Sequence, residues 1–180
     1  CLEGHADCRR GCRPPTHAQL LLQTDLFEVA VAAGVAAPTS TNMATKRFFT
    51  VGYEHTTLPG LIAGLQEAGV KRIIDTRDVA NSRRAGFSKK LLAASLDEEG
   101  IGYIHLRPLG TPKAGREANR AGRMDEFRRI YEASFMRPEA QLALLEAEEL
   151  IRAQPTALLC FCGDGAKCHR NRISEALETK

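Results

Sequence analysis

The sequence predicts an α/β fold of three layers, with a mostly parallel sheet of about four to five strands and helices on both faces. Two kinds of sequence segment, which alternate along the chain, lead to this prediction. From residue 48 onward, short segments rich in apolar, β-branched and aromatic residues alternate with longer segments whose apolar residues recur at helical spacing. Strands and helices that alternate in this way form parallel sheets through right-handed crossovers.

Each predicted element has its own pattern. The first helix has Leu58, Leu61, Ile62 and Leu65 at helical spacing and ends near Gly69, a residue that readily terminates a helix. The predicted strands cover residues 48–53, 70–75, 101–106 and 156–162. The predicted helices cover residues 58–69, 89–100, 125–135, 138–154 and 168–177. An order of this kind is typical of Rossmann or rhodanese-like domains.

The organisation along the chain predicts one domain and an appendage. Residues 1–42 show no strand pattern, and a weak helix over 18–33 is the only element that they favour. We therefore expect residues 1–42 to be a poorly structured N-terminal extension and residues 43–180 to be the folded α/β domain. A chain that begins at Met43 should then keep a cooperative thermal transition.

Composition limits the class of protein. Of the 180 residues, 43% are hydrophobic and 26% are charged, as in soluble globular domains. No run of about 18 apolar residues predicts a membrane span, and the short apolar run 29–37 lacks the basic flank of a signal peptide. Six cysteines lie in two groups that do not resemble a disulfide framework, so we expect a cytoplasmic protein. The sequence does not indicate an oligomeric state.

Ionisable side chains follow every predicted strand. In open parallel sheets, ligands bind beyond the carboxyl ends of the strands, where such side chains gather. The residues at these ends are Tyr53, Glu54 and His55; Asp75, Thr76, Arg77 and Asp78; His105 and Arg107; and Cys162, Asp164, Lys167, Cys168, His169 and Arg170. We therefore expect a functional site at this edge of the sheet.

The loop after the last strand is the most informative segment. Cys168 falls at the start of a helix, where the partial positive charge favours anions, yet the nearby charged residues include Lys167, Arg170 and Arg172. This is understandable if a bound phosphate, sulfate or carboxylate, or the Cys168 thiolate, is the missing anion. The alternative is that these cations face solvent or pair with acidic neighbours.

The remaining cysteines give no metal-binding pattern. We interpret Cys160 as a small buried hydrophobic residue. A zinc site made of Cys162, Cys168 and His169 matches no standard ligand spacing, so we expect no metal and no cofactor.

Two basic segments are candidates for ligand binding. In the loop after the second strand, Ser82 and Arg83 precede Gly86 and Phe87, and a glycine there lets the backbone approach a ligand. The alternative is a basic surface loop with Phe87 in the core. Between residues 107 and 129, seven basic residues face three acidic ones, which indicates either a solvated surface or a cationic rim.

Five ordered motifs give a family resemblance. They are Gly52-Tyr53-Glu54, Asp75-Thr76-Arg77, Ser82-Arg83 with Gly86-Phe87, Leu109-Gly110, and Cys168-His169-Arg170. In this pattern the chain resembles the family of domain of unknown function 488 (DUF488) over nearly all of 43–180. Family members often have Cys-Phe-Glu at the positions of Cys160-Phe161-Cys162, so an acidic role there is lost or moved. They also usually continue beyond the last helix with a strand that bears a histidine, whereas this sequence stops at Lys180.

These residues predict an enzyme that acts on a small anionic or phosphate-bearing substrate, such as a nucleotide or a nucleic-acid end. The expected catalytic residues are Glu54, Asp75, Cys168 and His169. The expected anion-binding residues are Tyr53, Arg77, Ser82, Arg83, Gly86, Phe87 and Arg170. The alternative is a non-catalytic module that recognises an anion or a phosphate group.

Overall fold

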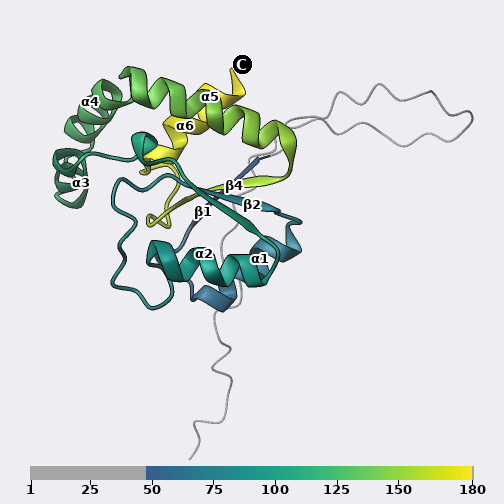
Figure 1. The fold of residues 1–180 in the computed structure, drawn as a ribbon. Helices are drawn as coiled ribbons and strands as arrows, with labels where there is room; N and C mark the ends of the chain where they lie inside the picture. Colours follow the sequence, from purple (N-terminus) through teal and green to yellow (C-terminus); the bar gives the residue numbers. More distant parts are fainter. Residues whose placement is uncertain (1–47, 180) are drawn as a thin grey trace, which may run out of the picture.

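The computed structural model describes residues 48–179 and shows a four-stranded, all-parallel sheet (Figure 1). The strands are β1 (Phe48–Gly52), β2 (Arg72–Asp75), β3 (Gly102–His105) and β4 (Thr156–Cys160). Their order in the sheet is β1-β4-β2-β3. The predicted α/β class is therefore confirmed, and the order places the carboxyl ends of β2 and β4 beside each other.

Six α-helices in the described residues cover the two faces of the sheet. They are α1 (Leu58–Glu67), α2 (Lys89–Glu98), α3 (Lys113–Arg120), α4 (Met124–Phe135), α5 (Pro138–Ala153) and α6 (His169–Glu178). Helices α1 and α2 lie on one face, and α5 and α6 lie on the other, with α4 beside them (Figure 1). A short 3-10 helix, Arg107–Leu109, connects β3 to α3.

The two central strands are buried from both sides. Ile73 and Leu159 pack against α1 and α2, whereas their chain neighbours Ile74 and Leu158 pack against α4, α5 and α6. All four side chains are fully buried. Successive residues of a strand point to opposite faces, which explains why these strands are apolar without alternation in the sequence.

The helix boundaries follow the local sequence. The hydroxyl of Thr57 caps α1 by accepting a hydrogen bond from the backbone N–H of Gly60 at 3.3 Å. Gly69 and Gly100 follow α1 and α2 with positive φ angles of 68° and 69°, a backbone conformation that glycine adopts without strain. Both helices thus end where the glycines predict.

Two features differ from the expected elements. Helix α3 was not expected, because its buried residues are the small Gly115 and Ala118 and leave no apolar stripe in the sequence. Strand β4 ends at Cys160, so Cys162 belongs to the loop that follows. The expected extension over 1–42, with its weak helix, lies outside the described residues. Across residues 48–179, no helix combines the length and the apolar character needed to cross a membrane.

Candidate functional site

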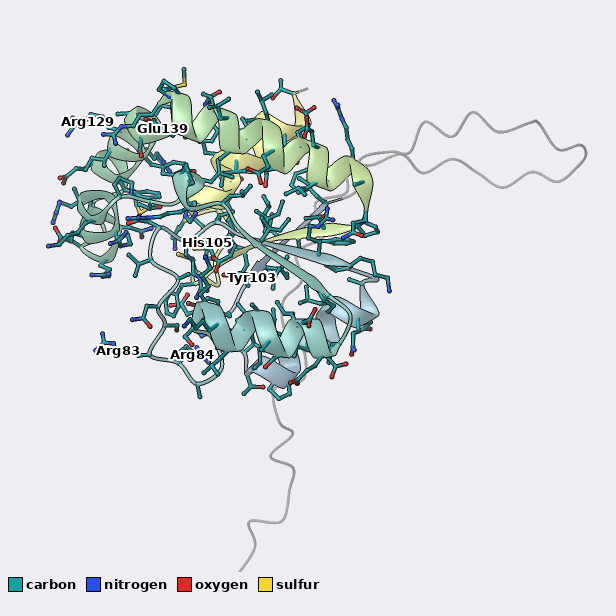
Figure 2. The ribbon with its side chains drawn as sticks, viewed as in Figure 1. Arg83, Arg84, Tyr103, His105, Arg129 and Glu139 are labelled. Atoms are coloured by element: carbon teal, nitrogen blue, oxygen red, sulfur yellow. The ribbon has the colours of Figure 1, made fainter. Side chains whose placement is uncertain are left out.

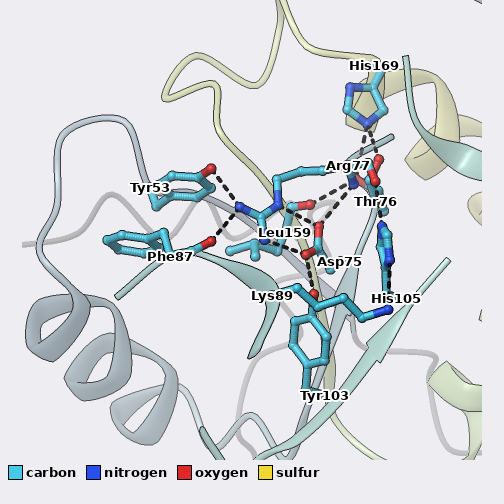
Figure 3. Close-up of polar contacts among 10 residues, drawn as sticks. All are labelled: Tyr53, Asp75, Thr76, Arg77, Phe87, Lys89, Tyr103, His105, Leu159 and His169. Carbon is cyan, nitrogen blue, oxygen red and sulfur yellow. Dashed lines mark hydrogen bonds and ion pairs between the residues drawn. The ribbon is translucent and has the colours of Figure 1, made fainter. Parts of the chain in front are cut away.

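Thr76 and His169 join the carboxyl end of β2 to the start of α6 (Figure 3). Thr76 donates its backbone N–H and its hydroxyl to the Leu159 carbonyl oxygen of β4, at 3.0 and 2.9 Å. Nε2 of His169 lies 3.0 Å from the Thr76 carbonyl oxygen and 3.1 Å from its hydroxyl. Because a carbonyl oxygen only accepts, Nε2 carries a proton. The ends of β2 and β4 therefore meet at this buried histidine.

Three thiols gather on the opposite side of the His169 ring. Cys160 is the last residue of β4, Cys162 follows in the loop, and Cys168 is the N-cap residue of α6. Their Sγ atoms all lie within 4.8 Å of one another. Nδ1 of His169 lies 3.8 Å from Sγ of Cys160 and 3.7 Å from Sγ of Cys168. The three cysteines form no disulfide; Cys160 and Cys168 are buried, and Cys162 is partly exposed.

Arg170 holds the loop and one sulfur in place. Its side chain is 2% exposed, and its Nε donates a hydrogen bond to Sγ of Cys168 at 3.3 Å. Its Nη2 donates to the carbonyl oxygen of Cys162 at 2.6 Å. We call this group the thiol cluster, which consists of Cys160, Cys162, Cys168, His169 and Arg170.

Gly52, at the end of β1, leaves the room that the thiol cluster needs. A Cβ atom on Gly52 would lie 1.9 Å from the Cys162 carbonyl oxygen and 3.1 Å from Nη2 of Arg170. The glycine is thus required for a close backbone approach.

The charges in the thiol cluster favour a thiolate on Cys168. Burial raises the pKa of the Cys168 thiol, but hydrogen bonds with Cys160 and Cys162 and the charge of His169 outweigh burial and hold that pKa well below its ordinary value. Burial lowers the pKa of His169, yet the attraction of Cys160 and Cys168 raises it well above its ordinary value. Hydrogen bonds with Cys160 and Cys168, together with burial, raise the pKa of Cys162 far above its ordinary value. The arrangement therefore favours a thiolate next to an imidazolium, with a neighbouring thiol as hydrogen-bond donor.

A pocket of about 400 Å³ opens between α4 and α6 beside Cys168 and His169. Its other lining residues include three arginines, Arg128, Arg129 and Arg172. Arg172 forms a double hydrogen bond with Glu132 at 2.9 and 3.1 Å, so the protein neutralises its charge. Arg129 is exposed on α4, and no ion pair is found for it within residues 48–179 (Figure 2).

Most basic residues between 107 and 129 are paired with acidic residues, which favours the solvated surface over the cationic rim. Five of the seven basic residues between 107 and 129 form ion pairs with acidic neighbours. These five residues are Arg107, Lys113, Arg116, Arg123 and Arg128. Within the described part of the chain, Arg120 and Arg129 remain without such a partner.

A second polar cluster lies around Arg77 at the same edge (Figure 3). Nε and Nη2 of Arg77 donate to the two carboxylate oxygens of Asp75 at 2.8 and 2.6 Å. Nη1 donates to the hydroxyl of Tyr53 at 2.7 Å and to the carbonyl oxygen of Phe87 at 2.9 Å. The Tyr103 hydroxyl donates to Asp75. We call this group the arginine network, which consists of Tyr53, Asp75, Arg77, Phe87 and Tyr103.

The arginine network is closed by protein groups. Asp75 is fully buried and Arg77 is 6% exposed. The rings of Tyr53 and Phe87 stack with their centroids 4.3 Å apart, which covers the guanidinium from one side. The structure thus brings Tyr53, Asp75, Arg77 and Phe87 together, as expected, but it directs most of their polar groups at one another.

The other expected residues lie around these two clusters. Glu54 accepts a hydrogen bond from the Gly163 backbone N–H at 2.8 Å and so ties β1 to the last loop. Gly86 has a φ of 83°, and a Cβ atom there would lie 2.6 Å from Leu58. Ser82 accepts a hydrogen bond from the Arg84 backbone N–H at 3.2 Å. Arg83 is exposed at the outside of its loop, away from both clusters (Figure 2).

Sequence reasoning did not single out four residues that shape the site. Arg84, not Arg83, turns inward and donates to the carbonyl oxygens of Glu54 and Thr56. Cys160 was interpreted as a packing residue, although it lies two residues before Cys162, a signal that both sulfurs share a region. The Thr76 carbonyl oxygen accepts a hydrogen bond from His169, and Gly52 permits a close backbone approach. Apart from their position at strand ends, nothing in the sequence indicates these roles.

The comparisons with known proteins support the resemblance seen in the motifs. The family model described as domain of unknown function DUF488 matches residues 57–177. Neither the curated proteins nor the solved structures contain a match to the chain. The matched segment runs from the cap of α1 into α6 and includes most of both clusters. The chain belongs to the DUF488 family.

Proposed function

We propose that this DUF488 domain is an enzyme that acts on a small anionic substrate, with Cys168 as the nucleophile. One observation carries the proposal. Cys168 lies at the N-terminus of a ten-residue helix, with Nδ1 of His169 at 3.7 Å and Nε of Arg170 at 3.3 Å, and it borders the pocket with Arg129. A helix N-terminus and two adjacent cations are the environment that lowers a cysteine pKa and activates the thiolate.

The geometry supports a two-step transfer through sulfur. In the first step, the Cys168 thiolate attacks an electrophilic phosphorus or carbonyl carbon, and the bond to the leaving oxygen breaks. The leaving oxygen takes a proton from Nδ1 of His169, which faces Sγ of Cys168. In the second step, water attacks the sulfur-bound group, gives its proton to Nδ1 and restores the thiolate. Thr76 keeps the ring oriented throughout, because it holds Nε2–H.

The charges favour a small anion over a nucleic-acid backbone. A pocket of about 400 Å³ is within the ordinary size for a small-molecule site. Five of the seven basic residues of the 107–129 stretch form ion pairs with four carboxylates, which leaves little continuous basic surface for a polymer. A nucleotide or another phosphate-bearing small molecule fits this description.

A non-catalytic anion-recognition module is the second candidate. The limited exposure of Cys168, at 4%, favours it, because a nucleophile must reach its substrate. In a module, Arg129 would bind the anion and the thiol cluster would only shape the pocket wall. Turnover separates the two candidates, because a module saturates with its ligand and converts none.

The pH dependence of alkylation tests the nucleophile. Chelator-treated protein is allowed to react with iodoacetamide, and the modified cysteines are identified by mass spectrometry. At about pH 6, an ordinary thiol is less than about 1% thiolate, whereas Cys168 should still react, because its pKa is depressed. Cys162, whose pKa is raised, is the internal control and should stay unmodified. If Cys168 reacts no faster than a small-molecule thiol over this range, the proposed function is wrong.

A further inference from the structure

We propose that Cys160, Cys162, Cys168 and His169 form a zinc site, and that zinc switches the nucleophile off. The metal site depends only on the arrangement of the four side chains. Its inhibitory effect rests on the proposed function of Cys168. The expectation of a zinc-free protein came from ligand spacing in the sequence and set Cys160 aside as a packing residue. In space, the sulfur of Cys160 lies beside the other two.

The donor atoms are already close to tetrahedral spacing. In a zinc site with three cysteines and one histidine, Zn–S bonds of about 2.3 Å place the sulfurs roughly 3.8 Å apart. The three Sγ atoms here lie within 4.8 Å of one another. Nδ1 of His169 lies 3.8 and 3.7 Å from two of them. Side-chain rotations of these four residues would close the site around an ion.

His169 is oriented as a metal ligand. A ligating histidine usually donates its other ring N–H to a carbonyl or carboxylate, which fixes both the tautomer and the ring orientation. Nε2 of His169 lies 3.0 Å from the carbonyl oxygen of Thr76, and the ring is 4% exposed. Nδ1 therefore faces the sulfurs, and its lone pair can bind an ion once Nδ1 has released its proton.

The surroundings balance the charge of the site. Three thiolates and one Zn²⁺ leave a net charge of −1, and the buried Arg170 supplies the compensating positive charge. Arg170 also donates to Sγ of Cys168 and to the carbonyl oxygen of Cys162, and so orients two ligands. Cys162 is half-buried, which gives the ion a route into the site.

Zinc binding and nucleophilic attack exclude each other at Cys168. As the metal binds, the thiols of Cys160 and Cys162 and Nδ1 of His169 release their protons to solvent, the Cys168 thiolate binds directly, and no electron is transferred. The Cys168 lone pair that would attack a substrate is then held by the metal. Four protein ligands leave no open position for water, so the ion inhibits and does not catalyse.

Metal titrations test the site directly. Cys1, Cys8 and Cys12 are first replaced by serine, so that every remaining thiol belongs to the described residues. Chelator-treated protein of this background is titrated with Zn²⁺ against a chromophoric chelator, and with Co²⁺ to follow the visible bands of tetrahedral coordination. We expect one ion per chain. We also expect Cys162→Ser to weaken zinc binding at least a hundredfold, because it removes one of the three sulfur ligands.

A protection assay on the unsubstituted chain covers the case in which a variant fails to fold. One equivalent of Zn²⁺ per expected site should slow alkylation of Cys168 at least tenfold, and a chelator should reverse this. Folded protein that binds well under one ion per chain overturns the metal site, and a reactive Cys168 in that protein leaves the proposed function intact. Stoichiometric zinc with an unreactive Cys168 in the metal-free protein supports the site and overturns the proposed function together with the inhibition.

Discussion

The arginine network and the thiol cluster lie at the same edge of the sheet but differ in how their charges are satisfied. In the arginine network, Arg77 forms a two-point ion pair with the buried Asp75 carboxylate. It donates further hydrogen bonds to the Tyr53 hydroxyl and to the Phe87 carbonyl oxygen. In the thiol cluster, the buried cations His169 and Arg170 face sulfur atoms, which accept hydrogen bonds weakly. The polar groups of the arginine network are satisfied without a ligand. The buried cations of the thiol cluster, in contrast, are stabilised by a thiolate, and its sulfurs can be bound by a metal ion.

This contrast assigns the two clusters different roles. A complete, buried ion pair holds the strand ends and the following loop together, and its loss lowers the free energy of unfolding. A cluster of thiols and cations beside a pocket instead changes the reactivity of its cysteines. Mutations in the two clusters should therefore have different effects on stability and on cysteine reactivity.

The largest effect is expected from Arg77→Met. The change keeps much of the side-chain volume but leaves the Asp75 carboxylate buried without its ion partner, so we expect a loss of about 3–5 kcal/mol in the free energy of unfolding. Urea denaturation measures it. Arg107→Met is the matched control, because its ion pair with Asp78 is exposed and should cost less than about 1 kcal/mol. If the variant instead lost anion binding with little change in stability, Arg77 would be a ligand-binding residue, as the sequence predicts.

Gly52→Ala should affect both stability and the thiol cluster. Its Cβ would lie 1.9 Å from the Cys162 carbonyl oxygen and must displace the loop, at a cost of about 1–3 kcal/mol. Alkylation of Cys168 should slow as well, because Arg170 contacts the same carbonyl. Gly102→Ala in β3 is the control, since its nearest neighbour would be 3.7 Å away. Equal effects at the two glycines would show that the close approach at Gly52 is unimportant.

Tyr103→Phe should weaken the arginine network without opening it. The variant loses one hydrogen bond to the Asp75 carboxylate, while the ion pair with Arg77 remains, so we expect a loss of about 1.5 kcal/mol. The alkylation rate of Cys168 should not change. A changed rate in this variant would mean that the two clusters are coupled and do not have independent roles.

The smallest effect is expected at Arg129. An exposed, unpaired arginine at the pocket should attract anionic iodoacetate more than neutral iodoacetamide. Arg129→Gln should therefore lower the ratio of the two alkylation rates at Cys168 by roughly twofold to fivefold, and most at low salt. Arg120→Gln, at an equally exposed arginine away from the pocket, should leave the ratio unchanged. Identical ratios in both variants would show that Arg129 does not attract anions to the pocket beside Cys168.

The sequence predicted the fold well because apolar periodicity and glycine positions report directly on strands and helix ends. It also predicted that the ends of two strands would meet, which follows from a parallel sheet. Helix α3 escaped prediction because Gly115 and Ala118, which it buries against its neighbours, carry almost no apolar signal. The sequence shows that Asp75 and Arg77 lie two residues apart, but only burial and distance reveal that they face each other instead of a ligand.

The order β1-β4-β2-β3 has a consequence for how the domain assembles. Strand β4 lies between β1 and β2, which do not pair with each other, and its first residue, Thr156, pairs with Phe48 far upstream in the chain. During synthesis, the first three strands emerge long before the strand that joins them, so the sheet closes late and through long-range contacts. Cys160, Cys162 and Cys168 emerge in the same late segment. A nascent chain therefore has no assembled thiol cluster until the sheet that supports it can form.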